Sequence, residues 1–331
     1  MKSVLVTGGT GSFGRAFVRR LLNEQEPERV VVYSRDELKQ YEMAQEFSDS
    51  RLRFFIGDVR DRDRLMRAMT DIDTVIHAAA LKHVPIAEYN PFECIKTNVH
   101  GAMNVIDVAI DRGVERVVGL STDKAAMPIN LYGASKLVSD KLFVTAQSYV
   151  GKGKTRFCVV RYGNVMGSRG SVIPFFLKQR ATGVIPVTDR RMTRFWITLD
   201  HGVDFVLMAS RCMHGGEVFV PKIPSMRIVD LVEAVAPGCE IREVGIRPGE
   251  KLHELMITAD DARRTREFDK HFVICPDLDY WNGSNYNGAR KVPDRFEYSS
   301  DKNSDWLTVP RMRAMLVELG LERAGPEPSR A

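Results

Sequence analysis

Long apolar runs and closely spaced cysteines are both missing from this chain of 331 residues. The five cysteines are an odd number, scattered along the sequence without zinc-binding spacing, which favours reduced thiols in a cytosolic protein. No apolar stretch approaches the ~18 residues that a membrane-spanning helix requires. No signal peptide precedes the first strand-like segment, residues 2–6. We therefore expect a cytoplasmic protein rather than a secreted or membrane-embedded one.

A large excess of one charge is missing as well. Lysine and arginine total 48 against 43 aspartate and glutamate residues, which gives a net charge of +5. The basic residues are spread along the chain, so the sequence does not predict a nucleic-acid partner, although it is compatible with a pocket for an anionic small molecule. Neither an internal repeat nor a heptad pattern is present, and no cluster has metal-ligand spacing. The apolar share of 44% and charged share of 27% are typical of a globular protein.

Apolar strands alternate with amphipathic helices in the first half of the chain. Continuous apolar strands separated by helices predict an α/β fold with a doubly wound parallel sheet, covered on both faces. The strands are expected at residues 3–7, 30–33, 53–57, 74–77, 117–120 and 157–160. In such a fold, ligands bind at the carboxyl ends of the strands.

The second half is less regular and predicts a smaller C-terminal substrate domain. We assign residues 1–165 to a dinucleotide-binding domain to which 197–224 return, and 166–320 mainly to the substrate domain. Residues 225–258 predict a helix, a strand and another helix, whereas 277–303 predict a loop-rich stretch. The tail, 322–331, is expected to be disordered.

A glycine-rich turn follows the first strand and opens the first helix. Gly9, Gly11 and Gly14 have G-x-G-x-x-G spacing, and Gly8, Gly11 and Gly14 fit G-x-x-G-x-x-G equally well. Glycines let the backbone approach a pyrophosphate closely, and the helix N-terminus offers free N–H groups. Because strand, turn and helix are in register, we predict a dinucleotide site rather than a simple structural turn. Its predicted contacts are Gly8, Thr10, Gly11, Ser12, Phe13 and Gly14.

The end of the second strand decides between the two nicotinamide dinucleotides. Arg35 offers a planar fork suited to a 2′-phosphate, with Lys39 one helical turn further on and the Ser34 hydroxyl beside them. We therefore predict NADP. Two alternatives stay open, an Asp36 carboxylate that holds an NAD ribose and a solvated Arg–Asp pair. The predicted contacts in this region are Ser34, Arg35, Asp36, Glu37, Leu38 and Lys39, followed by Asp58 and Val59 after the third strand and Ala78 and Ala79 after the fourth.

Tyr132 and Lys136 form a Y-x-x-x-K pair, whose spacing of four places both side chains on one helix face. A nearby ammonium lowers the pKa of a tyrosine, so Tyr132 can take a proton from a substrate hydroxyl while the carbon loses hydride. In an arbitrary protein this pair would be an exposed helix pair. After the glycine turn, the catalytic interpretation is favoured.

Thr122, Asp123 and Lys124 end the fifth strand, eight to ten residues before Tyr132. A dehydrogenase or a 4-epimerase needs a hydroxyl here but no additional acid and base. The Asp123–Lys124 pair supplies both, and a surface ion pair is the competing interpretation. Division of the acid and base roles between them goes beyond the sequence, because adjacent titrating groups share their proton equilibria.

Together these features resemble the extended branch of the short-chain dehydrogenase/reductase superfamily, over nearly the whole chain. The segment Ser121–Lys124, followed by the residues up to Lys136, is similar to UDP-N-acetylglucosamine 4,6-dehydratases, and the retained Tyr132 is most similar to the C5-inverting members that start pseudaminic acid biosynthesis. Supporting segments are 34–39, 80–85, 161–165, 167–174, 192–196 and 247–251.

The resemblance implies a mechanism. Tyr132 deprotonates the 4-hydroxyl as hydride leaves C4, Lys124 removes the C5 proton, and Asp123 helps the 6-hydroxyl to depart as water. Hydride then returns to C6, and C5 is protonated from the opposite face, while Thr122 orients O4. The implied contacts with the sugar nucleotide are Lys82, which also lies beside the cofactor, Asn164, Arg169, Gly170, Ser171, Val172 and Ile173. Arg194 and Arg247 are further candidates for its phosphates.

Relatives assemble through the helices that flank Tyr132, so we expect a homo-oligomer, a dimer or a hexamer. Two other functions stay open: another nucleotide-sugar enzyme, such as a dehydratase with a different C5 outcome or a UDP-sugar 4-epimerase, and a non-enzymatic NADP-binding protein. Two histidines are also considered as acid/base groups. His77 ends a buried strand and is expected to be packed, whereas His83 adjoins Lys82.

Overall fold

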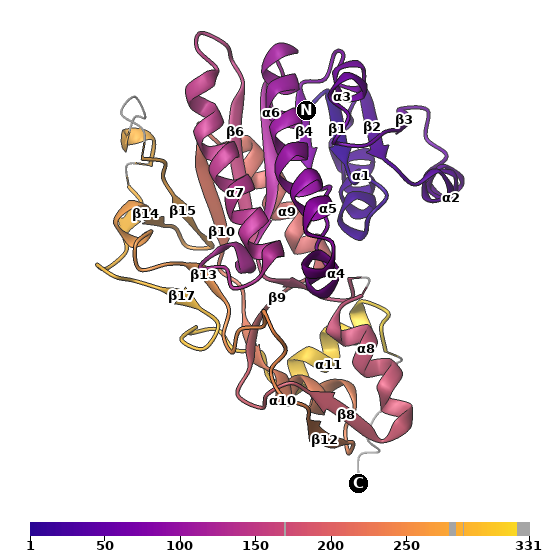
Figure 1. Ribbon diagram of the computed structural model, residues 1–331, viewed down its shortest axis with the longest axis vertical. Helices are drawn as coiled ribbons and strands as arrows, with labels where there is room; N and C mark the ends of the chain where they lie inside the picture. The colour runs from indigo at the N-terminus through magenta and orange to yellow at the C-terminus, as the bar shows by residue number, and fades with distance from the viewer. Residues whose placement is uncertain (169, 278–282, 287, 323–331) are drawn as a thin grey trace. The chain divides into compact units, whose positions relative to one another are not determined.

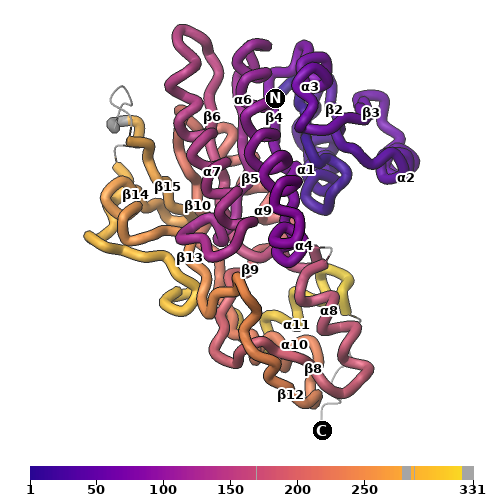
Figure 2. Tube along the Cα trace, in the orientation of Figure 1, coloured from indigo at the N-terminus to yellow at the C-terminus, as the bar shows by residue number. Residues whose placement is uncertain are grey.

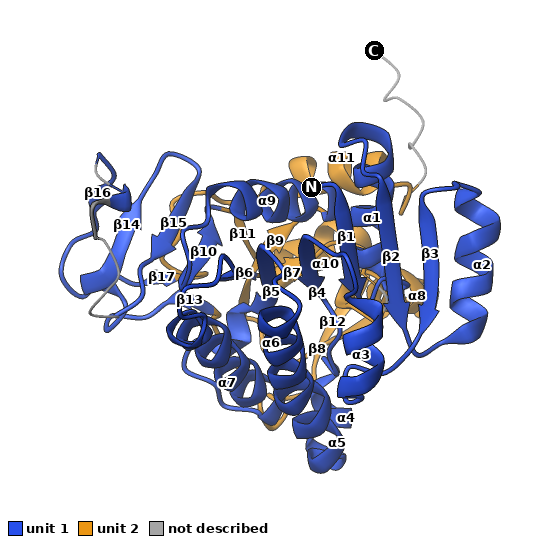
Figure 3. Cartoon of the chain, turned by 90° about the horizontal axis from the view of Figure 1, so that it is seen from above, with its two compact units in different colours: residues 1–162, 199–222, 255–298 blue, residues 163–198, 223–254, 299–331 orange. Residues whose placement is uncertain are grey.

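The computed structural model describes residues 1–168, 170–277, 283–286 and 288–322. The chain divides into two compact units, coloured separately in Figure 3. Unit 1 contains residues 1–162, 199–222 and 255–298, and unit 2 contains 163–198, 223–254 and 299–331.

Unit 1 is built on a ten-stranded sheet with the order β16-β14-β15-β10-β6-β5-β4-β1-β2-β3. The seven strands from β10 to β3 run parallel, which confirms the predicted doubly wound sheet. The strands are β1 (Ser3–Thr7), β2 (Arg29–Ser34), β3 (Leu52–Ile56), β4 (Thr74–His77), β5 (Arg116–Thr122), β6 (Arg156–Tyr162), β10 (Glu217–Pro221), β14 (Thr265–Glu267), β15 (His271–Ile274) and β16 (Arg290–Lys291).

Helices cover both faces of this sheet, so its central strands are apolar along their length. Figures 1 and 3 show α3, α6 and α7 on one face and α1 and α9 on the other. The helices of unit 1 are α1 (Ser12–Glu24), α2 (Glu37–Phe47), α3 (Arg62–Ala68), α4 (Val84–Tyr89), α5 (Pro91–Ile95), α6 (Gly101–Asp111), α7 (Leu131–Ala146) and α9 (Leu199–Cys212), with a π-helical turn at Lys96–His100 and a 3₁₀ turn, η2, at Asp123–Ala125.

The parallel register brings the ends of neighbouring strands to one edge of the sheet. Thr7 of β1 is opposite both Tyr33 of β2 and His77 of β4, and His77 is opposite Gly119 of β5. The segments that leave these strands are the glycine turn, residues 35–39, 78–82 and 122–124. The motifs predicted to bind cofactor and to carry the chemistry in unit 1 thus share one edge.

The sheet continues beyond its parallel part through a segment assigned above to the substrate domain. β15 pairs antiparallel with β10, and β14 pairs antiparallel with both β15 and β16. The segment can be followed in orange in Figure 2 beside β10. Residues 255–298 therefore group with unit 1, which differs from the predicted bounds because hydrogen bonds to β10 are made by a strand 50 residues later.

Unit 2 has its own core, which includes Trp196, Leu231 and Met312. It contains a three-stranded sheet, β11-β9-β7, and a two-stranded sheet, β12-β8. Its elements are β7 (Asn164–Val165), α8 (Val172–Gln179), β8 (Val184–Val187), β9 (Thr193–Ile197), β11 (Ser225–Arg227), α10 (Ile228–Val235), β12 (Glu240–Glu243) and α11 (Val309–Glu318).

One prediction in this region is wrong. The second helix expected within residues 225–258 is absent, and the chain instead forms a loop that leads to β13 (Leu255–Ile257). Gly245 and Gly249 have φ values of +88° and +80°, a left-handed conformation incompatible with an α-helix, and Pro248 lies between them. These residues end any helical run in this stretch, which explains why the second helix does not form. Among the described residues, no helix has the length and apolarity needed to cross a membrane.

Candidate functional site

The glycine turn between β1 and α1 is shaped for close approach of a phosphate. Gly8 has a φ of +66°, and a Cβ there would lie 2.9 Å from the Ala79 amide nitrogen. A Cβ on Gly14 would lie 2.5 Å from the Gly9 Cα. Gly11 is the N-cap of α1 and has no side chain to accept from the first-turn amides. These residues fit a dinucleotide, because the free N–H groups and the positive end of the helix face a turn in which glycines leave room for a phosphate.

The other residues predicted in this turn lie on the same segment. Ser12 is the first residue of α1, Thr10 is buried, and Phe13 stacks on Phe17 with ring centroids 5.6 Å apart. The Phe13 ring therefore packs on the surface of α1, and the backbone amide of Phe13 is the group that can bind a ligand.

The Asp36 side chain is the N-cap of α2. Its carboxylate caps α2 by accepting a hydrogen bond from the Lys39 amide at 3.0 Å, and the Lys39 ammonium contacts it as well. These hydrogen bonds from Lys39 lower the pKa of Asp36. The carboxylate therefore has a structural role as a cap, which weakens the alternative in which it holds an NAD ribose.

Arg35 keeps a half-exposed guanidinium at the same edge. Its Nη1 lies 3.5 Å from Asp58 Oδ2, a carboxylate oxygen that Arg60 also binds, with Nη2 at 2.6 Å. Asp58 would keep a cationic partner if Arg35 turned toward a phosphate. Ser34 is buried, and its Oγ accepts a hydrogen bond from Gln40 at 3.0 Å. Of the remaining residues predicted here, Glu37 begins α2 and Leu38 is 66% exposed.

The end of β4 is joined to the glycine turn, and the end of β3 is joined to α6. The Ala79 amide donates to Thr7 Oγ1 at 3.2 Å, and the Ala78 amide donates to the Thr7 carbonyl at 3.2 Å. Val59 is buried, and its carbonyl accepts from Asn104 at 3.0 Å. These contacts hold the small residues Ala78 and Ala79 against the turn.

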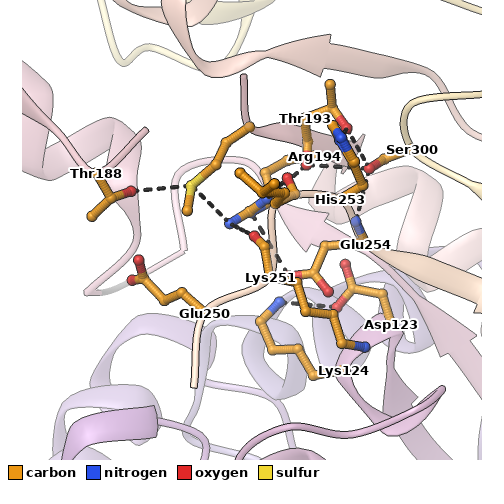
Figure 4. A network of polar contacts seen from close by, with 12 residues as sticks. Asp123, Lys124, Thr188, Thr193, Arg194, Glu250, Lys251, His253, Glu254 and Ser300 are labelled. Atoms are coloured by element: carbon orange, nitrogen blue, oxygen red, sulfur yellow. Dashed lines mark hydrogen bonds and ion pairs between the residues drawn. The ribbon is translucent and has the colours of Figure 1, made fainter. Parts of the chain in front are cut away.

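The catalytic candidates of unit 1 converge beyond the end of β5. Thr122 ends the strand, and Asp123 and Lys124 form η2 just before α7. Lys124 Nζ and Thr122 Oγ1 each donate to Asp123 Oδ1 at 2.9 Å, and the Tyr132 side chain is hydrogen-bonded to Thr122. Asp123 is fully buried, and Figure 4 shows its contact with Lys124. The structure thus joins a carboxylate, an ammonium group, a hydroxyl and a phenol in one polar network.

The lowered pKa expected for Tyr132 is not found in this network. Burial raises the pKa of Tyr132 to about 12, whereas the Lys124 ammonium and the bond with Thr122 lower it. Burial lowers the pKa of Lys136, which is 3% exposed, and the Asp140 carboxylate acts in the opposite direction. The phenol therefore depends on neighbouring cations to ionise near neutral pH.

Lys82 belongs to the same surroundings. Partial burial and then the charge of Lys124 lower its pKa, so the two ammonium groups lie near each other. The preceding residue, Leu81, is held at both backbone groups by Asn98, which accepts from the Leu81 amide at 2.8 Å and donates to its carbonyl at 2.9 Å. The backbone next to Lys82 is therefore held in place by Asn98.

Asn98 is a residue that the sequence analysis missed. It lies in the π-helical turn Lys96–His100, where its amide also donates to Ser135 Oγ at 2.9 Å. Ser135 in turn donates to the Tyr132 carbonyl at 2.8 Å. Asn98 thus ties the loop that carries Lys82 to the helix that carries Tyr132. No local signal marks it, because an asparagine within a helical segment is ordinary and π-turns have no distinctive sequence.

The two histidines have different surroundings. His77 is 1% exposed, and its Nδ1 shares a hydrogen bond of 2.9 Å with Thr7 Oγ1. Burial and then the charge of Lys136 lower the pKa of His77 to about 3, so it stays neutral and packed. His83 is exposed and is the N-cap of α4. Among the described residues, no group of three or more His, Cys, Asp or Glu side chains is arranged to hold a metal ion.

The substrate candidates of unit 2 lie in two places. Gly170, with a φ of +73°, precedes Ser171, which is the N-cap of α8, and Asn164 lies on β7. Ser171 Oγ is buried without a hydrogen-bond partner in the part of the chain that is described. Val172 begins α8, whereas the Ile173 side chain is fully buried in the core, so only its backbone can face a ligand. Arg169 lies outside the described residues.

The second place is the loop before β13. Arg194 donates to the carbonyls of Thr193, Lys251 and Leu252 at 2.7, 3.0 and 3.0 Å, as Figure 4 shows from close by. Its Nε lies 3.7 Å from Glu254 Oε1. A phosphate at Arg194 must therefore displace one of these partners. The Arg247 side chain is 59% exposed and has a looser pair with Glu250 at 3.9 Å.

Comparison with known proteins gives consistent matches over nearly the whole chain. Residues 4–276 match the family of polysaccharide biosynthesis proteins. A UDP-N-acetylglucosamine 4,6-dehydratase (inverting) from Campylobacter jejuni is 56% identical over 93% of this chain and 95% of the relative. A UDP-glucose 4-epimerase from Rickettsia conorii is 40% identical over 96% of each chain. The crystal structure of Pen from Bacillus thuringiensis has a TM-score of 0.89 and 39% identity, and covers 97% of this chain and 98% of that one.

Proposed function

Since this chain belongs to the polysaccharide biosynthesis protein family, within the extended short-chain dehydrogenases/reductases, we propose that it is a UDP-N-acetylglucosamine 4,6-dehydratase that inverts C5. The observation that carries this proposal is the contact of Lys124 with Asp123 at 2.9 Å beside Tyr132. The product is UDP-2-acetamido-2,6-dideoxy-β-L-arabino-hex-4-ulose, the first intermediate of pseudaminic acid biosynthesis.

Tyr132 begins the reaction as the base for the 4-hydroxyl. Its hydrogen bond with Thr122 fixes the phenol, Lys124 supplies positive charge near it, and Lys136 lies one turn further along α7. The 4-ketone formed by loss of hydride from C4 makes the neighbouring C5 proton acidic. A phenol with a bonded partner and nearby ammonium groups matches what this step requires.

Lys124 and Asp123 then carry out the elimination. A neutral Lys124 amine takes the C5 proton, while a protonated Asp123 donates to O6 as it leaves as water. The two groups share a proton equilibrium through their 2.9 Å contact, so one proton can serve both. Loss of water across C5–C6 and delivery of a proton to C5 from the opposite face give the inverted centre.

A bound dinucleotide would supply the acceptor for the hydride from C4 and the donor of hydride to C6, so that the sugar would undergo no net oxidation. The turn of Gly8, Gly11 and Gly14 would hold its pyrophosphate, and Lys136 would face its nicotinamide ribose. We propose NADP rather than NAD because Arg35 and Lys39 supply positive charge at the adenine ribose, while Asp36 already caps α2.

Cationic and polar groups are proposed as contacts of the sugar nucleotide in each unit taken by itself. In unit 1 the group is Lys82. In unit 2 the proposed groups are Asn164, Arg169, Gly170, Ser171, Val172, the Ile173 backbone, Arg194 and Arg247. Of the two candidate arginines that the structure describes, Arg247 has the more exposed side chain and the longer ion pair, which suits it to a phosphate.

A UDP-sugar 4-epimerase is the second candidate, favoured by the name of the relative from Rickettsia conorii. An epimerase needs Tyr132 and the dinucleotide, but no acid–base pair that faces C5 and C6. The buried Asp123 bonded to Lys124 costs folding free energy and has no use in that reaction, so the dehydratase is favoured.

We also propose a homo-oligomer in the cytoplasm. Large apolar side chains are exposed on α4 and α5, where Tyr89 is 88% and Phe92 79% exposed, with Ile86 nearby in the sequence. Such side chains gain free energy when a second copy covers them. Light scattering after size-exclusion chromatography distinguishes a dimer or hexamer from the monomer that would contradict this assignment.

Incubation of the purified protein with UDP-N-acetylglucosamine tests the activity. A 4-keto-6-deoxy product with inverted C5 supports the dehydratase, a 4-epimer supports the second candidate, and no turnover contradicts both. Proton NMR at C5 separates inversion from retention.

A further inference from the structure

A buried carboxylate lies one helical turn beyond the proposed catalytic pair. Tyr132, Lys136 and Asp140 follow one another at intervals of four residues, so they share one face of α7. They are 9%, 3% and 3% exposed. Neither the dinucleotide site nor the acid–base chemistry proposed above uses Asp140. Burial of this carboxylate is therefore not explained by cofactor binding or by the acid–base chemistry.

The contacts of Asp140 connect the elements that carry the reaction. Its Oδ2 accepts hydrogen bonds from Ser121 Oγ at 2.8 Å and from Arg161 Nη2 at 3.1 Å. Ser121 directly precedes Thr122 on β5, and Arg161 lies on β6 and donates through Nη1 to the Met256 carbonyl at 2.8 Å. One carboxylate thus holds α7, β5 and β6 in a fixed arrangement from within the unit.

Asp140 also contributes negative charge to the active groups. Its carboxylate opposes the lowering of the Lys136 pKa by burial, and it raises the pKa of Tyr132. The other charged or titratable groups that face this pair are His77 toward Lys136, and Lys124, Asp123 and Tyr162 toward Tyr132. The Arg161 guanidinium forms a buried ion pair with Asp140, so loss of the carboxylate would leave the charge of Arg161 without this partner.

We propose that Asp140, bound by Arg161 and Ser121, is a positioning residue that sets the placement of Tyr132 and Lys136 relative to Thr122. The inference rests on the proposed function, because it assigns Tyr132 and Lys136 to the hydride step. It predicts that Asp140 acts on the rate of the reaction and not on the binding of the sugar nucleotide.

A cavity of about 510 Å³ within unit 1 makes the proposal testable by chemical rescue. Asp140 and Arg161 line it together with the exposed residues Lys141 and Arg295, so it opens to solvent. Arg161 Nε is buried without a hydrogen-bond partner in the described part of the chain. Truncation of Asp140 would leave a cationic pocket that a small carboxylate can enter from this cavity.

The experiment measures kcat and KM for UDP-N-acetylglucosamine in Asp140→Ala with and without acetate. Without acetate, kcat is expected to fall about 100-fold through misplacement of the reacting groups, while KM stays unchanged. Acetate is expected to restore part of kcat in a saturable manner. Asp140→Asn fills the same space without the charge, so it should lose rate and resist rescue. Asp260→Ala, which removes an exposed carboxylate from the same cavity, is the control and should retain the wild-type kcat.

The results separate the two proposals. A wild-type kcat in both Asp140 variants, a loss that resides in KM, or a loss in Asp140→Ala without rescue by acetate would overturn the positioning role. A wild-type enzyme that makes a 4-epimer would overturn the dehydratase, while the ratio of variant to wild-type rate would still test Asp140. Complete lack of turnover in the wild type would overturn both.

Discussion

Replacement of Arg35 by alanine should reduce the affinity for NADP and leave the affinity for NAD unchanged. Arg35 is half exposed and lies 3.5 Å from Asp58, and Arg60 binds the same carboxylate with Nε at 2.9 Å and Nη2 at 2.6 Å. Arg35 can therefore turn to a 2′-phosphate without leaving Asp58 unpaired. The variant loses charge-assisted hydrogen bonds to the phosphate but disrupts little else.

The size of the effect follows from that exposure. A hydrogen bond to a charged group contributes about 1.5–3 kcal/mol, and solvent screening at a half-exposed side chain reduces this contribution to about 1–2 kcal/mol. A loss of about 1–2 kcal/mol corresponds to roughly 5- to 30-fold weaker NADP binding. Lys39 retains part of the attraction, although its ammonium is shared with Asp36.

Calorimetric titration of cofactor-free protein with each dinucleotide measures this difference. Arg53→Ala is a matched control, because Arg53 donates to the Ser50 and Leu52 carbonyls at the opposite end of β3. It should change neither affinity. An equal loss for NADP and NAD in Arg35→Ala, or no loss for either, would refute the assignment of Arg35 to the 2′-phosphate.

Three further substitutions test the proposed chemistry and the cofactor turn. Tyr132→Phe removes the base for the 4-hydroxyl and should lower kcat by roughly 10²- to 10⁴-fold with the dinucleotide still bound, and near-normal turnover in a steady-state assay would exclude that role. Lys124→Ala should keep NADP binding but abolish deuterium entry at C5 in D₂O, and wild-type exchange by NMR would remove the base assignment. Gly14→Ala places a methyl group 2.5 Å from the Gly9 Cα, so calorimetry should find dinucleotide binding lost, whereas wild-type affinity would show that the turn is not the cradle.

Local sequence patterns predicted the parts of this protein that depend on short spacings. The turn from Gly8 to Gly14 needs close backbone approach, and only glycine permits it, so the pattern identifies the structure. The spacing of Tyr132 and Lys136 requires one helix face, which α7 provides. The parallel sheet followed from continuous apolar strands because burial on both faces requires them.

Features that depend on distant pairing were not predictable in the same way. β15 joins the sheet through hydrogen bonds to β10, and neither strand indicates its partner by composition. Asn98 acts through contacts with Leu81 and Ser135, which are 17 and 37 residues away. The ion pair of Asp140 and Arg161 forms only when α7 packs on β6. These residues became evident once the tertiary structure brought their partners together.

The most direct test of the dehydratase is turnover of UDP-N-acetylglucosamine in D₂O, followed by proton NMR of the product and by absorbance at the wavelength of reduced nicotinamide. We expect a 4-keto-6-deoxy sugar with inverted configuration and one deuterium at C5, without accumulation of free reduced dinucleotide. Stoichiometric release of reduced dinucleotide, or a product that retains its C5 proton from the substrate, would contradict it.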